Sequence, residues 1–234
     1  KERPGKLIHI IAYGPTRTPP QTFRKFPGNV IIELAPYSQE IMKRWKGYQV
    51  KNGFTVYLYN WGYYHTEGFT PKASSGFLSA QAADFRRDRI RGIYFCGFGE
   101  LFGLEGPAYY QFLKQLEDPA LKAEVLRRRY CQGLFGDAAP EMEKFYSLID
   151  SRLQFDVPGR FQDWNAPDLV MNKRKTRDYY ESLRLLQVRW TPEVIAELDK
   201  VLTAAEKKNQ SRQMKDARLE FDYLKLTAAV ASGY

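Results

Sequence analysis

The chain has 234 residues, of which 44% are hydrophobic and 15% aromatic, and its formal net charge is +9. This length allows one large domain or two small ones around a buried core, and no apolar stretch reaches the roughly 18 residues that a membrane span needs. The positive charge permits nucleic-acid binding, but the longest basic run is the Arg127–Arg129 triplet, in a helical pattern that also contains acids. A dedicated nucleic-acid binder is therefore not expected.

Four runs in the first hundred residues predict buried strands. They are Lys6–Ala12, Asn29–Ala35, Phe54–Tyr59 and Gly92–Gly97. Each run is rich in β-branched or aromatic residues and is apolar almost throughout, which is typical of parallel strands that are buried on both faces. The connections are long and contain no two-residue hairpin signal, so we expect parallel neighbours in sequence order.

The connections between these strands carry helical and irregular patterns. Ser38–Tyr48 and Ser79–Ile90 are expected to be crossover helices that place their apolar side chains against the sheet. The first connection, Tyr13–Gly28, is rich in proline and is predicted to be irregular.

Helical periodicity dominates the second half of the chain. Capping residues predict helices over Ala120–Gln132, after Asp118-Pro119, and over Ala138–Ile149, after Asp137. Two more are expected, one beginning at Thr191-Pro192 and one over Ser211–Ala231. Between them, Phe155–Met171 reads as a linker-like loop.

Four βα-type units make half of an eight-stranded barrel, which in full needs about 250 residues. Either the sheet is open, or an upstream half is absent from this chain. The predicted class is therefore α/β, a parallel (β/α) barrel-type half with an all-helical C-terminal region. Residues 1–106 are assigned to the second half of a (β/α)8-type barrel and residues 107–234 to the helical region. A half-barrel has open sheet edges, so we expect an upstream half-barrel segment or a second chain as partner.

Candidate site residues follow the predicted strands, because active sites of parallel barrels lie at the carboxyl ends of their strands. A sugar site combines aromatic rings, which cover the apolar face of the sugar, with polar groups for its hydroxyls. The predicted substrate-binding residues are Tyr13, Tyr59, Asn60, Trp61 and Glu100, with Trp61 as the stacking platform. Ordinary packing at a strand end is the alternative role for these aromatic residues.

Acidic residues near the strands limit what chemistry the chain can perform. Glu100 follows a glycine-flanked strand end and is the one weak candidate for a catalytic acid or base; its alternative role is charge at a helix entry, which Glu105 fits better. Glu33 lies inside a strand, where a buried carboxylate must be paired. Glycoside hydrolysis ordinarily uses two carboxylates, and the sequence does not place two together.

No cofactor or metal motif is present. There are two histidines, His9 and His65, and the two cysteines, Cys96 and Cys131, lack metal-ligand spacing. Cys96 is expected to be a buried thiol, and pairing of the two cysteines stays open. Neither a metal nor a cofactor is predicted.

Several segments occur in an order that resembles a known family. The segments are Ala12-Tyr13 before Pro19-Pro20, Asn29–Pro36, Tyr57–Trp61, Gly92–Phe95, Leu104-Glu105 with Tyr109, Gln115–Pro119, Tyr130–Gly136, Ala138–Pro140 and Ala217–Leu226. They resemble the carboxyl-terminal half of the family called domain of unknown function 4838. It is a carbohydrate-associated family that is grouped with barrel glycoside hydrolases of the hexosaminidase and α-glucuronidase type.

The resemblance implies a glycoside hydrolase-like barrel that binds a glycan at the ends of its strands, in an extracellular or periplasmic location. In related hexosaminidase-type barrels the catalytic acids follow the fourth strand. If this chain begins at the fifth strand, those acids lie outside it, and the residues named above bind substrate without performing the chemistry. The alternatives are a non-catalytic carbohydrate-binding or scaffold protein and a basic helical module that binds nucleic acid.

Overall fold

A computed structural model of the chain describes residues 5–61, 69–153 and 186–233. Its sheet has four parallel strands in the order β1-β2-β3-β4, as the sequence predicts. The strands are β1 (Ile8–Ala12), β2 (Val30–Leu34), β3 (Phe54–Leu58) and β4 (Gly92–Phe95). Within the described residues the sheet is open at β1 and β4 and does not close into a barrel.

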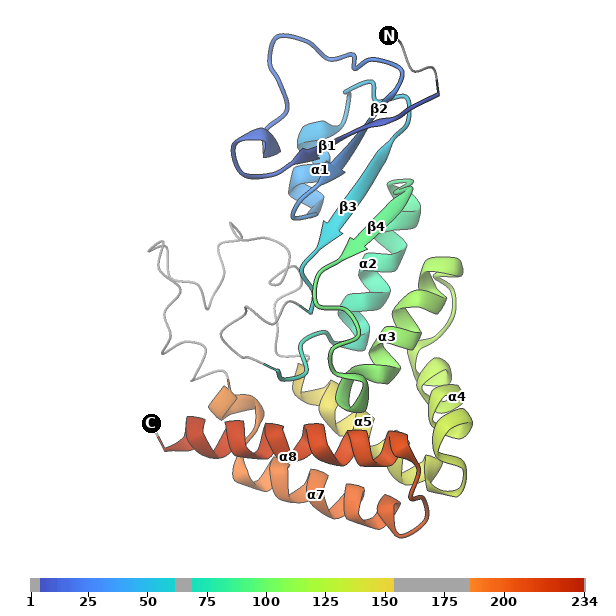
Figure 1. Cartoon of the computed structure of the whole chain (residues 1–234), viewed down its shortest axis with the longest axis vertical. Helices are drawn as coiled ribbons and strands as arrows, with labels where there is room; N and C mark the ends of the chain where they lie inside the picture. The colour runs from blue at the N-terminus through green and yellow to red at the C-terminus, as the bar shows by residue number, and fades with distance from the viewer. Residues whose placement is uncertain (1–4, 62–68, 154–185, 234) are drawn as a thin grey trace.

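The two faces of the sheet differ in composition, because successive side chains of a strand point to opposite sides. Ile32, Leu34 and Val56 lie on one face and are fully buried against the helices. These helices are α1 (Gln39–Trp45) and α2 (Ser75–Arg87), which cover the far side of the sheet in Figure 1.

The prediction that every strand is buried on both faces is wrong. Ile8 and Ile11 of β1 point to opposite faces and are 52% and 51% exposed. β1 is an edge strand, so it has a neighbour on one side only. This exposure is the pattern of a strand that lacks a covering layer.

Serine caps fix the starts of both crossover helices. The Ser38 hydroxyl accepts a hydrogen bond from the Ile41 amide, and the Ser74 hydroxyl accepts one from the Phe77 amide. A capping serine satisfies an amide that the first turn leaves without a partner. Helix α2 therefore begins at Ser75, one turn before the predicted start. The Pro-rich first connection has only a short 3-10 turn, Gly14–Arg17, as its regular structure.

The rest of the described chain is helical, as predicted, and lies beyond the carboxyl ends of β3 and β4 (Figure 1). The helices are α3 (Phe102–Glu117), α4 (Ala123–Phe135), α5 (Ala139–Leu153), α7 (Pro192–Glu206) and α8 (Arg212–Ser232). Helix α3 starts before Pro107 and runs across the proposed division between residues 106 and 107. The predicted loop Phe155–Met171 lies outside the described residues.

The predicted helix starts at Thr191 and Ser211 are confirmed, and the predicted cap at Asp118 is not. Asp137, the other predicted cap, lies inside a short 3-10 helix, Gly136–Ala138, that leads into α5. The Thr191 and Ser211 hydroxyls accept hydrogen bonds from Val194 and Met214 amides, which starts α7 and α8 as predicted. The Asp118 carboxylate instead accepts from the Ala120 amide in a turn, and α4 begins only at Ala123. The short side chain of aspartate accepts hydrogen bonds from nearby backbone amides both in turns and at helix starts, so the sequence alone does not distinguish the two.

Glycine permits the close approach of α3 to α8. A Cβ atom on Gly103 would lie 2.7 Å from the Ala217 Cα, which is closer than van der Waals contact. The carboxylate of Glu220 accepts a hydrogen bond of 2.8 Å from the Leu104 amide at the same crossing. Helix α8 thus packs directly on the helix that continues from the sheet. None of the helices in the described part of the chain is long and apolar enough to cross a membrane.

An arginine joins α7 to α8 and provides a test of the helical packing. The Arg218 guanidinium donates to Asp199 at 2.6 Å and to Glu206 at 2.8 Å and 2.9 Å, and its side chain is 21% exposed. Charge-assisted hydrogen bonds contribute about 1.5–3 kcal/mol. We expect Arg218→Ala to lower the free energy of unfolding by about 2 kcal/mol in urea denaturation.

The matched control is Arg212→Ala on the same helix. The Arg212 side chain is 89% exposed and lies 3.8 Å from the Asp216 carboxylate. Exposed pairs of this kind contribute about 0–1 kcal/mol. Equal effects of the two substitutions would contradict a stabilising role for the Arg218 network.

Candidate functional site

A polar group lies on the sheet face that the helices leave open. The Glu33 side chain is buried, and its carboxylate accepts a hydrogen bond of 3.4 Å from the Thr55 hydroxyl. His9 Nε2 lies 2.9 Å from the Thr55 hydroxyl and 3.5 Å from the same carboxylate. The strand register brings the three residues together, because Glu33 is directly opposite Thr55. The predicted pairing of Glu33 is thereby confirmed.

Four tyrosines continue this face toward the carboxyl ends of the strands. Tyr57 and Tyr94 are register partners on β3 and β4, and their rings stack with centroids 4.6 Å apart. The centroid of the Tyr59 ring lies 4.8 Å from that of the Tyr57 ring. Tyr13 adjoins Tyr59 from the end of β1. We call Tyr13, Tyr57, Tyr59 and Tyr94 the tyrosine cluster.

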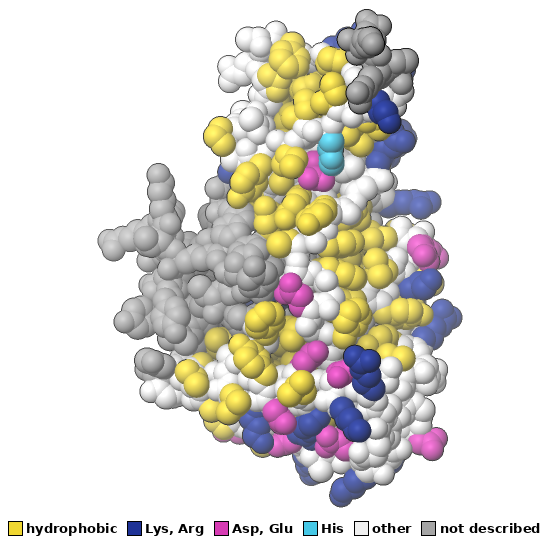
Figure 2. Space-filling model, viewed as in Figure 1, with side chains coloured by type: hydrophobic (Ala, Val, Ile, Leu, Met, Phe, Trp, Pro, Cys, Tyr) yellow, Lys and Arg dark blue, Asp and Glu magenta, His cyan; other side chains and the backbone are white. Residues whose placement is uncertain are grey.

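Parts of the tyrosine cluster are open to solvent. Tyr13 is 57% exposed and Tyr94 is 55% exposed, whereas Tyr57 and Tyr59 are half-buried. Figure 2 shows this face, with His9 in cyan beside an acidic side chain and among hydrophobic side chains. The surface therefore combines ring faces and phenolic hydroxyls, and it lies beside the buried carboxylate of Glu33.

The hydroxyls of Tyr57 and Tyr59 keep their protons at neutral pH. Burial, followed by the effects of the neighbouring Cys96 thiol, raises the pKa of Tyr57 to about 12. Burial and the adjacent Tyr13 also raise the pKa of Tyr59. A protonated phenol can both donate and accept hydrogen bonds, and these two already interact with Cys96 and Tyr13.

The structure separates the predicted substrate-binding residues into two groups. Tyr13 and Tyr59 belong to the tyrosine cluster. Asn60 is fully buried, and its amide donates a hydrogen bond of 2.8 Å to the Gln81 side chain of α2. Glu100 is exposed in the turn before α3. Asn60 therefore ties the end of β3 to a helix and does not face the tyrosine cluster.

Trp61 is also in the core. Its side chain is 3% exposed, and the rings of Phe98 and Tyr109 each meet it in T-shaped contacts with centroids 5.2 Å apart. A ring enclosed in this way has no free face for a sugar. Trp61 therefore contributes to the packing of the core.

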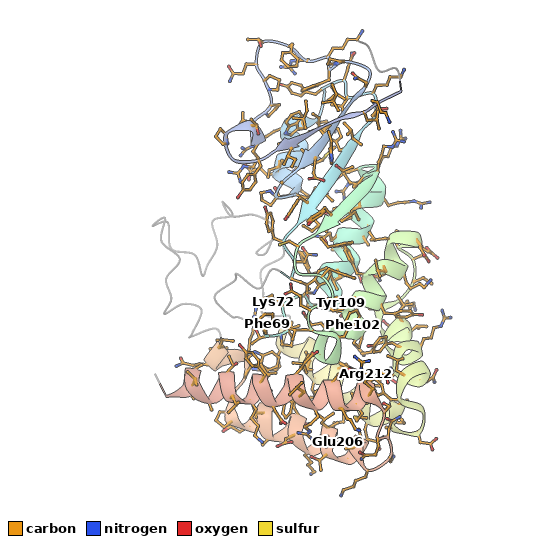
Figure 3. All side chains as sticks on the ribbon, viewed as in Figure 1. Phe69, Lys72, Phe102, Tyr109, Glu206 and Arg212 are labelled. Carbon is orange, nitrogen blue, oxygen red and sulfur yellow. The ribbon has the colours of Figure 1, made fainter. Side chains whose placement is uncertain are left out.

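A second polar group lies where the chain returns to α2. The Glu105 carboxylate is buried and accepts hydrogen bonds from the amides of Lys72 at 2.6 Å and Ala73 at 3.4 Å. It also accepts one of 3.3 Å from the Tyr109 hydroxyl. Figure 3 shows Lys72 and Tyr109 together, with Phe69 and Phe102 nearby.

Burial raises the pKa of Glu105 to about 7, although Lys72 and the amide hydrogen bonds act in the opposite direction. The sequence suggests that Glu105 is a helix-entry charge. It does lie in the first turn of α3, but its carboxylate binds a different segment, residues 72–73. Glu105 is therefore an anchor between α3 and the segment that leads into α2.

The two cysteines are free thiols. Cys131 is buried in the helical region, and Cys96 is half-buried on the open side of the sheet beside Tyr57. The expectation that Cys96 is buried is thus wrong, because it follows β4 on the uncovered face.

Four residues of this face are absent from the predicted substrate-binding residues: His9, Thr55, Tyr57 and Tyr94. The signal that could have found them is alternation combined with register. Residues two apart on a strand share a face, and neighbouring parallel strands place such rows side by side. Because Tyr57, Tyr59 and Tyr94 obey this alternation, the row is visible once the register is known.

One comparison with known proteins gives a match. The model of a family described as a domain of unknown function (DUF4838) matches residues 1–147. Neither a curated protein nor a solved structure matches the chain. The match covers all four strands and extends through the first half of α5.

Proposed function

The chain belongs to the family described as domain of unknown function 4838, and on that premise we propose that it binds a glycan on the open face of its sheet. The observation that carries the proposal is the tyrosine cluster next to the paired Glu33 carboxylate. Sugar rings have apolar C–H faces and polar edges. A ligand of this kind needs aromatic area and hydrogen-bonding groups together, and this face has both.

The proposed role of these residues is to bind the glycan, and they do not carry out its hydrolysis. Glycoside hydrolysis commonly needs a second carboxylate across the bond from the first. In the open-face group Glu33 is the acidic residue, and its carboxylate is already held by Thr55 and His9. We therefore infer a glycoside hydrolase-like protein whose acid and base lie on an upstream half-barrel segment or a second chain.

The second candidate is a non-catalytic carbohydrate-binding or scaffold protein. The same tyrosine face serves it equally well, since glycan binding needs no acid pair. An Asp-Glu pair after a fourth strand, in an upstream segment of the same gene, would favour the hydrolase. An extracellular or periplasmic location is part of both proposals.

Tyr94→Ala tests the binding face. Tyr94 presents an exposed ring that stacks on Tyr57, so its loss removes aromatic area without opening the core. Using a glycan array to find a ligand and calorimetry to measure it, we expect affinity to fall about tenfold, which corresponds to about 1.4 kcal/mol. Binding should not change with salt, because the contacts involve no ionic attraction.

The matched control is Tyr223→Ala, which removes a tyrosine of α8 that is 44% exposed and lies outside the cluster. It should leave glycan affinity unchanged. Equal loss in both variants, or unchanged affinity in Tyr94→Ala, would overturn the assignment. Tight binding to DNA that collapses as salt rises would favour the nucleic-acid alternative instead.

A further inference from the structure

A cavity lies at the amino end of the sheet, away from the tyrosine cluster. Its volume is about 730 Å³, and it forms where the end of α2 meets the start of β4. Figure 1 shows the end of α2 beside the start of β4. The lining residues are Ala82, Phe85, Arg86, Arg89, Ile90, Arg91, Gly92, Ile93 and Leu116.

The charged residues that line this cavity are three arginines, and no acid is among its lining residues. The Arg91 guanidinium donates a hydrogen bond of 3.0 Å to the Asn52 carbonyl, which holds it in place. In the described part of the chain, the side chains of Arg86 and Arg89 make no hydrogen bond or ion pair. By contrast, the intervening Arg87 pairs with Asp84 and Asp88 and does not line the cavity.

The backbone at Arg89 is held in a conformation that side chains disfavour. Arg89 has a φ of 55°, in the left-handed region. The Arg89 amide bonds to the Arg86 carbonyl, and the Ile90 amide bonds to the Phe85 carbonyl. This is the helix-ending pattern in which the left-handed position usually belongs to glycine. An arginine at such a position costs stability, and strain of this kind is concentrated at binding sites.

We propose that this cavity binds a phosphate or sulfate group carried on a partly apolar molecule. Guanidinium groups present paired N–H donors that match the oxygens of such anions. Phe85 is buried and lines the cavity, and Ile93 and Leu116 extend its apolar wall. The arginines bind the anion and the apolar wall accommodates the body of the molecule. This site is separate from the proposed glycan face and does not depend on it.

Calorimetry with two probes tests the site on the full chain. Phenyl phosphate supplies the anion and an apolar ring, and inorganic phosphate supplies the anion alone. We expect both to bind, with phenyl phosphate at least several-fold tighter, and affinity to fall with salt as it does for ionic contacts. Benzyl alcohol, which has the ring without the charge, should show no binding.

Substitutions locate the site. Arg86→Ala should weaken phenyl phosphate binding about tenfold or more, whereas the control Arg87→Ala should change it less than twofold. Arg89→Gly should raise the melting temperature, because glycine relieves the left-handed strain, and should weaken binding about tenfold at the same time.

Several results would overturn the proposal. They are the absence of phosphate binding, equal loss of affinity in Arg86→Ala and Arg87→Ala, and a more stable Arg89→Gly variant that binds phenyl phosphate as tightly as the original chain. The last result would leave the arginine at this position without a ligand to explain its strain.

Discussion

Trp61→Ala should lower the free energy of unfolding by about 3–5 kcal/mol, the range for removing a large aromatic side chain from a core. Trp61 is 3% exposed and lies between the sheet and α3. Its ring meets those of Phe95, Phe98, Tyr109 and Phe112, all with centroids within 6.2 Å. Removing the indole leaves a cavity that four other rings cannot fill without moving.

Urea denaturation of three variants tests this role. Trp61→Phe should cost less than Trp61→Ala, because it keeps part of the ring volume. In the original chain the indole nitrogen of Trp61 has no hydrogen-bond partner within the described residues. Trp61→Phe therefore loses no hydrogen bond. The control Tyr94→Ala removes a ring that is 55% exposed and should cost less than about 1 kcal/mol. A stable Trp61→Ala variant that has lost glycan binding would return Trp61 to the site.

The strands and their order were predictable from the sequence because buried strands have continuous runs of apolar residues. Ile32, Leu34 and Val56 belong to such runs and are buried on the face of the sheet that the helices cover. Long connections without hairpin signals leave parallel crossovers as the available geometry. The exposure of β1 at the edge of the sheet could not be predicted in this way, because Ile8, Ile10 and Ile11 are apolar although they are exposed.

The candidate site was predictable only in part, because residue type does not fix side-chain direction beyond a strand. Tyr59 follows directly after β3 and keeps its alternation, so it lies beside Tyr57. Asn60 and Trp61 lie further along, where the backbone has left the strand, and both turn into the core. Their aromatic and amide character suits a sugar site and a packed core equally well.

Contacts between distant segments were beyond prediction. The Glu105 carboxylate binds the Lys72 amide, 33 positions away, and no local pattern records such a contact. Its position in the first turn of α3 is consistent with the simpler role of a helix-entry charge. The difference between the two roles depends on burial, which only the tertiary structure supplies.

Glu105→Gln should remove a dependence of stability on pH. Burial raises the pKa of Glu105 from an ordinary 4.5 to about 7, so the folded chain holds this proton more tightly than the unfolded chain. The resulting stabilisation is fully present below about pH 4.5 and is lost as the pH rises through about 7. The loss amounts to about 3 kcal/mol, because each unit of pKa corresponds to about 1.4 kcal/mol.

The variant keeps an oxygen acceptor for the amides of Lys72 and Ala73 but carries no titrating group. Urea denaturation at pH 5 and pH 8 gives the free energy of unfolding of both proteins. We expect the stability of the original chain, relative to the variant, to fall by about 2–3 kcal/mol between the two pH values. Titrations shared by both proteins cancel in this difference.

Glu117→Gln is the matched control on the same helix, since the Glu117 side chain is 71% exposed and its partner is the exposed Lys114. The free energy of unfolding of Glu117→Gln should stay within about 1 kcal/mol of that of the original chain at both pH values. If the stability of Glu105→Gln follows that of the original chain in parallel from pH 5 to pH 8, the Glu105 carboxylate ionises equally easily in the folded and unfolded chains. The anchor would then be a solvated contact, and the segment at residues 72–73 would be held mainly by the packing around it.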